Sequence, residues 1–264
     1  MKSCFSVSIL VVALMTLGFT QIDSWAADAT NPTAFRVLVF SKTLGFRHDS
    51  IPAGLAAIRE LGTKHNFTVD ATEDSTAFTE TNLARYRSVV LLSVTGDVWN
   101  PEQQLAFKEY VLAGGGLAAI HGSMFGPLAC EDKWAWYGEV FCCAFTNHSA
   151  VQPAIVKLED ATHPSTFGLP SQWQRTDEWY NYTGTPRGCA QILATVDEST
   201  YQGGKMGQDH PIAWCRPVGQ GRMWYTAMGH TDSSYSEPLF QQHLLGGIQY
   251  AAKFLPKAAT GSKP

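Results

Sequence analysis

Apolar runs of strand length alternate with segments of helical periodicity through the first half of the chain. Residues 35–40 form an apolar, β-branched run, and apolar residues then recur at helical spacing over 51–65. A second helix is predicted from Pro101 to about residue 113, because Asn100 and Gln103 have the spacing of a capping box. Further strand-length runs lie at 67–71, 88–94 and 117–120. This alternation is typical of a parallel sheet that is covered by helices on both faces.

The second half has a different pattern, in which short strands dominate. Strands are predicted at 151–158, 173–182, 191–196, 211–216 and 222–228, and a final helix at 237–254. No internal repeat and no linker of low complexity interrupts the chain. The sequence therefore predicts one domain over 35–255, with an α/β sheet that is parallel in its first half and a β-rich elaboration in its second half.

The first 26 residues have the features of a secretory signal. A cationic start is followed by an apolar stretch at 7–19, and small residues at 24 and 26 suit cleavage after Ala26. No other stretch approaches the roughly 20 apolar residues of a membrane span. We therefore expect an exported protein, periplasmic or secreted, with a polar leader at 27–34, a flexible tail at 256–264 and no stable membrane span after cleavage. An uncleaved anchor is the alternative.

Charge and cysteine content narrow the partners and the kind of site. A net charge of −4 and an isoelectric point near 6.0 give no basic surface, so no nucleic-acid partner is expected. No cysteine pair has CxxC spacing, which argues against a structural zinc cluster. Export permits a disulfide, for which Cys189 with Cys215 and Cys130 with Cys142 are candidate pairs. Buried free thiols are the alternative.

Three polar stretches follow the predicted parallel strands at the points where those strands end. Arg47 and His48 lie in the loop after the first strand, Asp97 follows the third strand, and His121 ends the fourth. In open α/β sheets, ligands bind beyond the carboxyl ends of the strands. We therefore expect these side chains to meet at that edge of the sheet.

Seven longer motifs, in order over nearly the whole mature chain, carry a family resemblance. They are KTLGFRHDSI at 42–51, GGGLAAIH at 114–121, HPSTFGLP at 163–170, DEWYN at 177–181, DESTYQGGKMG at 197–207, DHPIAWC at 209–215 and GRMWYTAMGH at 221–230. Together they resemble the ThuA-like (trehalose utilisation) family. The resemblance implies a flavodoxin-like fold related to class I glutamine amidotransferases, and a link to disaccharide catabolism through 3-keto sugars.

Glutaminase activity is not expected, in spite of the related fold. A glutamine amidotransferase needs a nucleophilic cysteine on the turn after a central strand, and no cysteine lies between Leu117 and Gly126. The turn contains Ser123 instead, but without the Gly-x-Ser-x-Gly motif of a nucleophile elbow.

The candidate site residues are histidines, carboxylates and their aromatic neighbours. The candidate catalytic residues are His48, His121, Asp177, Glu178, His210 and His230. The candidate substrate-binding residues are Arg47, Asp97, Trp179, Tyr180 and Asp209. Because adjacent residues of a strand face opposite sides, Asp177 and Glu178 are not expected to share one pocket.

Two chemistries fit this set of residues. Histidines with a carboxylate could hold a divalent metal, for which His121 and His230 are the candidate ligands, although no HExxH motif is present. Alternatively, histidine and carboxylate work without metal as acid and base. Large aromatics at Trp134, Trp136 and Tyr201 either stack on sugar rings or fill the core.

The leading hypothesis is an exported enzyme that acts on a disaccharide or 3-keto-glycoside as a hydrolase, lyase or isomerase. The alternative is a sugar-binding protein without turnover on the same fold. In both cases the partner is a small carbohydrate, and an oligomer is compatible with the sequence.

Overall fold

The computed structural model describes residues 34–125 and 134–254. The predicted signal segment, nearly all of the leader, the C-terminal tail and Cys130 lie outside these ranges.

A nine-stranded mixed sheet forms the centre of the fold, in the order β2-β1-β3-β4-β11-β10-β9-β6-β7. Its parallel part contains β1 (Phe35–Phe40), β2 (Phe67–Thr72), β3 (Ser88–Leu92), β4 (Gly116–Ile120) and β11 (Gly221–Thr226). Its antiparallel part contains β6 (Gln152–Leu158), β7 (Gln172–Asp177), β9 (Gln191–Val196) and β10 (Pro211–Val218). A small second sheet pairs β5 (Phe145–His148) with β8 (Tyr180–Tyr182). The predicted division between a parallel first half and a β-rich second half is confirmed.

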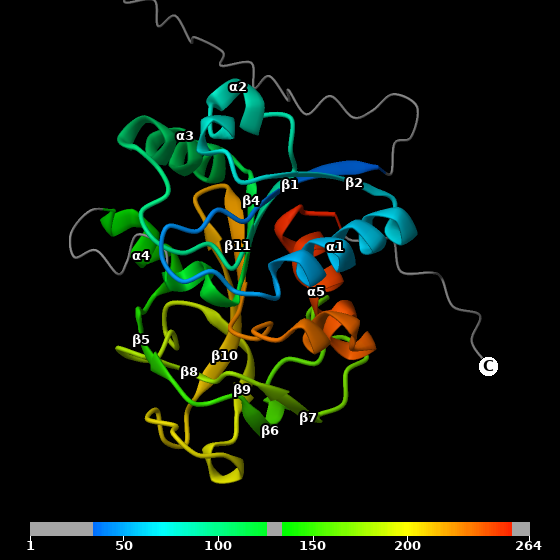
Figure 1. Cartoon of the computed structure of the whole chain (residues 1–264), viewed down its shortest axis with the longest axis vertical. Coiled ribbons are helices and arrows are strands. Elements are labelled where there is room, and N and C mark those ends of the chain that lie inside the picture. Colours follow the sequence, from blue (N-terminus) through cyan, green and yellow to red (C-terminus); the bar gives the residue numbers. More distant parts are fainter. Residues whose placement is uncertain (1–33, 126–133, 255–264) are drawn as a thin grey trace, which may run out of the picture.

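Helices cover both faces of the parallel part (Figure 1). The helices α1 (Ile51–His65) and α5 (Pro238–Ala251) lie on one side, and α3 (Pro101–Leu112) and α4 (Ala135–Phe141) lie on the other. The short helix α2 (Glu80–Leu83) packs against α3. Turns of 3-10 helix occur at Ser75–Ala77, His121–Phe125, Glu198–Thr200 and Asp232–Ser236. Within the described ranges, none of these helices has both the length and the apolar character that a membrane span requires.

Local sequence signals account for the ends of the helices. The predicted capping box of α3 is confirmed, because the Gln103 amide donates to Asn100 Oδ1 at 2.9 Å and the Asn100 amide donates to Gln103 Oε1 at 3.0 Å. The helix α5 lies close to β11 because it carries Gly247 at the contact. A Cβ atom at Gly247 would come within 2.3 Å of the Trp224 indole.

Two strands differ from the prediction, and both differences shape the site. The segment 222–228 belongs to the parallel part, because β11 inserts beside β4. The predicted single strand 173–182 is wrong. It breaks at Glu178 and Trp179, so β7 and β8 belong to different sheets. Hydrogen bonds to Asp177 accompany the break. Its carboxylate accepts the backbone N–H of Glu178 and those of Gly229 and His230, which come after β11.

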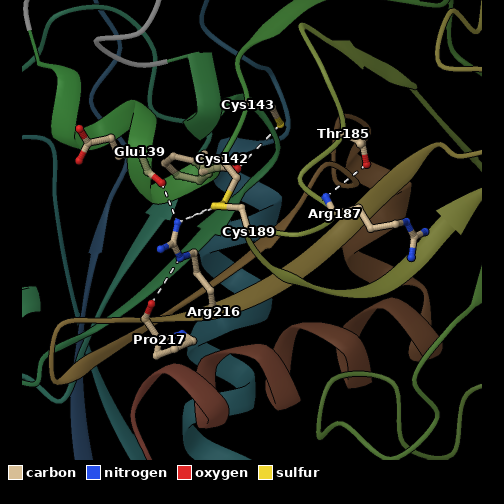
Figure 2. The surroundings of a disulfide bond; sticks show 9 residues. Glu139, Cys142, Cys143, Thr185, Arg187, Cys189, Arg216 and Pro217 are labelled. Carbon is tan, nitrogen blue, oxygen red and sulfur yellow. Dashed lines mark hydrogen bonds between the residues drawn. A yellow bond between two sulfur atoms is a disulfide. The ribbon is translucent and has the colours of Figure 1, made fainter.

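A disulfide joins Cys142, at the end of α4, to Cys189, in the loop before β9 (Figure 2). The Arg216 guanidinium lies against both sulfur atoms, at 3.1 Å from Cys142 Sγ and 2.8 Å from Cys189 Sγ. Neither pair considered from the sequence contains this combination. The chain turns at Cys142, which adopts a left-handed conformation with φ of 69°, and Cys215 is left as a buried free thiol.

Two histidines that are not site candidates, His163 and His243, pack between α5 and the loop after β6. His243 Nδ1 lies 2.8 Å from the Ser165 carbonyl, and His163 Nδ1 lies 2.9 Å from Ser165 Oγ. Burial lowers the pKa of His243 to about 3 and that of His163 to about 4. Both rings are therefore neutral in the folded protein near neutral pH.

Removing the disulfide should lower the free energy of unfolding. The bridge closes a loop across a sequence separation of 47, so the double variant Cys142→Ala/Cys189→Ala should lose about 4 kcal/mol through the greater entropy of its unfolded chain. Urea denaturation of the oxidised proteins measures this loss. The free thiol next to the bridge provides the control, since Cys143→Ala should change stability much less. A double variant as stable as the wild type contradicts the prediction.

Stability should also fall as the pH is lowered from 6.5 toward 4. The unfolded chain binds protons at histidines that stay neutral in the folded state, so the folded state is favoured above pH 6.5 and loses that advantage below it. His243→Asn can still donate to the Ser165 carbonyl. It should reduce the slope of the unfolding free energy against pH by up to about 1.4 kcal/mol per pH unit.

Urea denaturation between pH 4 and 7 measures this slope. The exposed His65 supplies the matched control as His65→Asn. This variant should reduce the slope less than His243→Asn does, because only partial burial and Lys64 lower the pKa of His65. Equal slopes for His243→Asn and the wild type show that His243 does not stay neutral in the folded state.

Candidate metal centre

Four side chains from separate segments converge at the carboxyl edge of the parallel strands. His48 lies in the loop between β1 and α1, His121 follows β4, His230 follows β11, and Glu178 lies at the break between β7 and β8. One ring nitrogen of each histidine and one carboxylate oxygen of Glu178 all lie within 4.8 Å of one another. The parallel topology brings the three histidines together, and the strand break adds the carboxylate.

His121 is the most constrained member of this cluster. It is fully buried and adopts φ of 50°, a left-handed conformation that is uncommon outside glycine. Its Nδ1 lies 2.6 Å from the Ala227 carbonyl, so Nδ1 carries the hydrogen and Nε2 presents its lone pair to the cluster. His230 Nδ1 lies 3.1 Å from this Nε2, and the Tyr180 hydroxyl lies 2.9 Å from it.

Glu178 connects the histidines to the protein surface. Its Oε2 lies 3.5 Å from His121 Nε2 and 3.3 Å from His230 Nδ1. Its other oxygen, Oε1, lies 2.9 Å from Nδ1 of His148, whose side chain is 47% exposed. His148 was not among the sequence candidates. Its position depends on the pairing of β5 with β8, which places it opposite Tyr180. No local sequence pattern predicts that pairing.

The spacing of the cluster fits a tetrahedral metal ion. Nitrogen and oxygen ligands of zinc lie about 2.0–2.2 Å from the ion, which separates two tetrahedral ligands by about 3.3–3.6 Å. The three distances among His121 Nε2, His230 Nδ1 and Glu178 Oε2 are 3.1, 3.3 and 3.5 Å. Three ligand positions therefore exist without rearrangement, and His48 lies next to them.

The electrostatics of the cluster also suit a cation. Burial lowers the pKa of His48 to about 3, with a further contribution from His121 and His230, and its Nδ1 has no hydrogen-bond partner among the described residues. Burial opposes the ionisation of Glu178, but the neighbouring imidazoles of His121 and His230 outweigh this and lower its pKa to about 2. The hydrogen bond to Glu178 raises the pKa of His230. One fixed carboxylate among imidazole lone pairs is a donor set for a divalent metal.

Asp177 lies behind the cluster and holds two of its members in place. Its fully buried carboxylate accepts the backbone N–H of Glu178 at 2.9 Å, of Gly229 at 2.8 Å and of His230 at 3.0 Å. Nη2 of the buried Arg175 lies 2.9 Å from its Oδ2. Asp177 and Glu178 therefore point into different environments, and Asp177 positions the chain without reaching the cluster.

Three other candidates lie outside the cluster. His210 is buried between Glu198 Oε1 at 2.8 Å and the Tyr180 carbonyl at 2.7 Å. Asp209 forms an exposed ion pair with Arg187 at 2.6 Å. Trp179 is fully buried, and its indole N–H donates to a carbonyl in β6, so its ring is unavailable for stacking on a sugar. Burial and pairing thus give these three side chains structural contacts in place of the predicted ligand contacts.

The remaining candidates divide in a similar way. Tyr180 enters the cluster, whereas both terminal nitrogens of Arg47 bond Glu73, at 3.1 and 2.7 Å. Asp97 is half-buried in the loop between β3 and α3. Ser123 is buried and donates to the Leu91 carbonyl, so its hydroxyl is not a free nucleophile.

The aromatic segment after β4 packs inward rather than over the cluster. Tyr137 is fully buried, and Trp134 contacts the ring of Trp99 at 5.7 Å between centroids. Tyr201 is buried as well and bonds His210 through its hydroxyl. Tyr137 and Tyr201 belong to the core, and the partly buried Trp134 and Trp136 pack against it.

Comparison with known proteins agrees with the fold. A family model described as trehalose utilisation (ThuA) matches residues 36–251, whereas no curated protein matches the chain. A ThuA-like protein from Bacteroides uniformis superposes with a TM-score of 0.70 at 20% identity, over 82% of this chain and 91% of its own. A ThuA-like protein from Parabacteroides merdae has a TM-score of 0.68 at 22% identity. The match covers 83% of this chain and 90% of the Parabacteroides chain.

A β-galactosidase from Bacillus circulans is similar at a TM-score of 0.53 and 12% identity, over 81% of this chain and 30% of that enzyme. At such identities these structures show the shared fold alone. The family model, in contrast, spans nearly all of the described sheet and its helices. The chain therefore belongs to the ThuA (trehalose utilisation) family.

Proposed function

We propose that this chain is an exported, metal-dependent enzyme of carbohydrate metabolism that acts on a disaccharide or a 3-keto-glycoside. The observation that carries the proposal is the cluster of His48, His121, His230 and Glu178, whose ligand atoms lie within 4.8 Å of one another. The carbohydrate substrate rests on the family, whose description is trehalose utilisation.

The residues of the cluster divide between holding the metal and handling the substrate. A bound divalent cation supplies Lewis-acid polarisation of a sugar hydroxyl or carbonyl oxygen. Tyr180 stays protonated because burial raises its pKa well above the ordinary value, so its hydroxyl can donate a hydrogen bond to a ligand oxygen. His148 fixes the outer oxygen of Glu178 at the exposed side of the cluster.

Export is part of the proposal because two independent features support it. The first 26 residues have the pattern of a secretory signal. The disulfide between Cys142 and Cys189 supports export, because such bonds form and persist in oxidising compartments.

A metal-free acid–base enzyme is the second candidate. The distances of 3.1 Å from His230 to His121 and 3.3 Å from His230 to Glu178 are also compatible with direct hydrogen bonding. In that case the cluster is a proton-transfer network. A sugar-binding protein without turnover is the remaining alternative, and the same experiment separates all three.

The test combines metal content with turnover on one preparation of the mature protein. We expect about one equivalent of a transition metal by elemental analysis, and turnover of trehalose or 3-keto-glucosides that chelation abolishes and added metal restores. His121→Ala and His230→Ala should each weaken metal binding at least about 100-fold, since loss of even an outer-shell partner costs 10- to 100-fold. Asp209→Asn, in a surface ion pair, is the matched control and should bind metal normally.

Each other outcome selects an alternative. Turnover of the sugar by metal-free protein selects the acid–base mechanism without metal. Sugar binding without turnover, in both the metal-loaded and the metal-free protein, assigns the binding protein. Metal binding that survives both histidine substitutions excludes this cluster as the metal centre.

A further inference from the structure

Two large apolar side chains stand exposed in the loop that leads to His48. Leu44 and Phe46, in the loop between β1 and α1, are 65% and 64% exposed. The Phe46 ring meets the His48 ring edge-on, with centroids 4.9 Å apart and an interplanar angle of 83°. Ligand sites combine aromatic and apolar side chains with a few polar groups.

The loop that carries Phe46 is held in place from both sides. On one side the Leu44 amide donates to the Thr95 carbonyl at 2.8 Å, and Thr95 Oγ1 donates to the Phe46 carbonyl at 2.8 Å. Gly96, with φ of 81°, allows this close approach, because a Cβ atom there would come within 2.8 Å of the Gly45 nitrogen. The exposed ring is therefore presented on a fixed backbone, which lowers the entropic cost of binding a ligand.

On the other side, Arg47 and Glu73 neutralise each other. The guanidinium donates to both carboxylate oxygens, at 3.1 and 2.7 Å. Arg47, which follows Phe46, thus holds the loop in place, and its charge is paired with that of Glu73. The surroundings of the ring favour an uncharged ligand over an anionic one.

A continuous series of ring contacts runs from Phe46 through the metal centre. Ring centroids lie 4.6 Å apart between His48 and His121 and 4.5 Å apart between His121 and Tyr180. Beyond Tyr180 follows the half-buried Phe145, again at 4.5 Å. Aromatic side chains therefore lie at both ends of the cluster, and Phe46 is more exposed than Phe145.

We propose that Phe46 is the platform of a second sugar subsite, which holds one ring of a two-ring glycoside while the other ring is bound at the metal centre. A pyranose has faces of C–H bonds, which pack on an aromatic face, and an edge of hydroxyls that remains in water. An exposed ring beside a paired charge matches these requirements. This inference rests on the proposed carbohydrate function and adds the place where the second ring of the glycoside binds.

The test compares disaccharide and monosaccharide binding by calorimetry on metal-loaded protein. The probes are trehalose, 3-keto-trehalose and glucose. Phe46→Ala should weaken binding of the disaccharides about 5- to 30-fold, the loss typical of truncating an aromatic contact, and change glucose binding less than about twofold. Phe46→Trp should keep the wild-type preference. Leu44→Ala, equally exposed in the same loop, is the matched control and should leave all affinities unchanged.

Metal stoichiometry, measured in parallel, identifies a variant that has lost its fold or its metal centre. Unchanged disaccharide affinity in Phe46→Ala overturns the subsite and leaves the proposed function standing. An equal loss in Leu44→Ala also overturns it, because the effect then comes from the apolar surface of the loop in general. A wild type that binds neither disaccharide overturns the carbohydrate function, and the subsite with it.

Discussion

The buried carboxylate of Asp177 is the interaction on which the candidate site depends. It accepts backbone N–H groups from both the break between β7 and β8 and the loop after β11, so it ties the antiparallel part of the sheet to the parallel part. An unpaired buried carboxylate is strongly unfavourable, and Arg175 stabilises this one with its guanidinium. With that anchor in place, Glu178 and His230 are directed toward the same point.

The parallel strands provide the rest of the geometry. His121 follows β4 in a left-handed conformation, and its Nδ1 is bonded to the carbonyl of Ala227, in the segment that leaves β11. Adjacent strands thus fix both the direction of the ring and the nitrogen that faces the cluster. The strain of one backbone residue is compensated by contacts from its neighbours, an arrangement common at functional sites.

The sequence predicted the features that depend on local signals. The bounds of α1, the capping box of α3 and the meeting of His48 with His121 follow from periodicity, capping chemistry and parallel topology. The break at Glu178 and the contribution of His148 depend on pairings between distant strands, which periodicity does not contain. Trp179 was predicted to bind substrate, but its indole is buried. Sequence alone does not distinguish a buried indole from one that faces a ligand.

The position of β11 has a consequence for the order in which the molecule is assembled. It is the last strand within the described residues, yet it lies between β4 and β10 and is the link between the two parts of the sheet. A nascent chain that lacks it has two partial sheets with open edges, which are prone to wrong pairing. His230 follows the same strand, so an incomplete chain also lacks one member of the candidate site. The cluster of His48, His121, Glu178 and His230 is therefore complete only when the segment that contains β11 has joined the sheet.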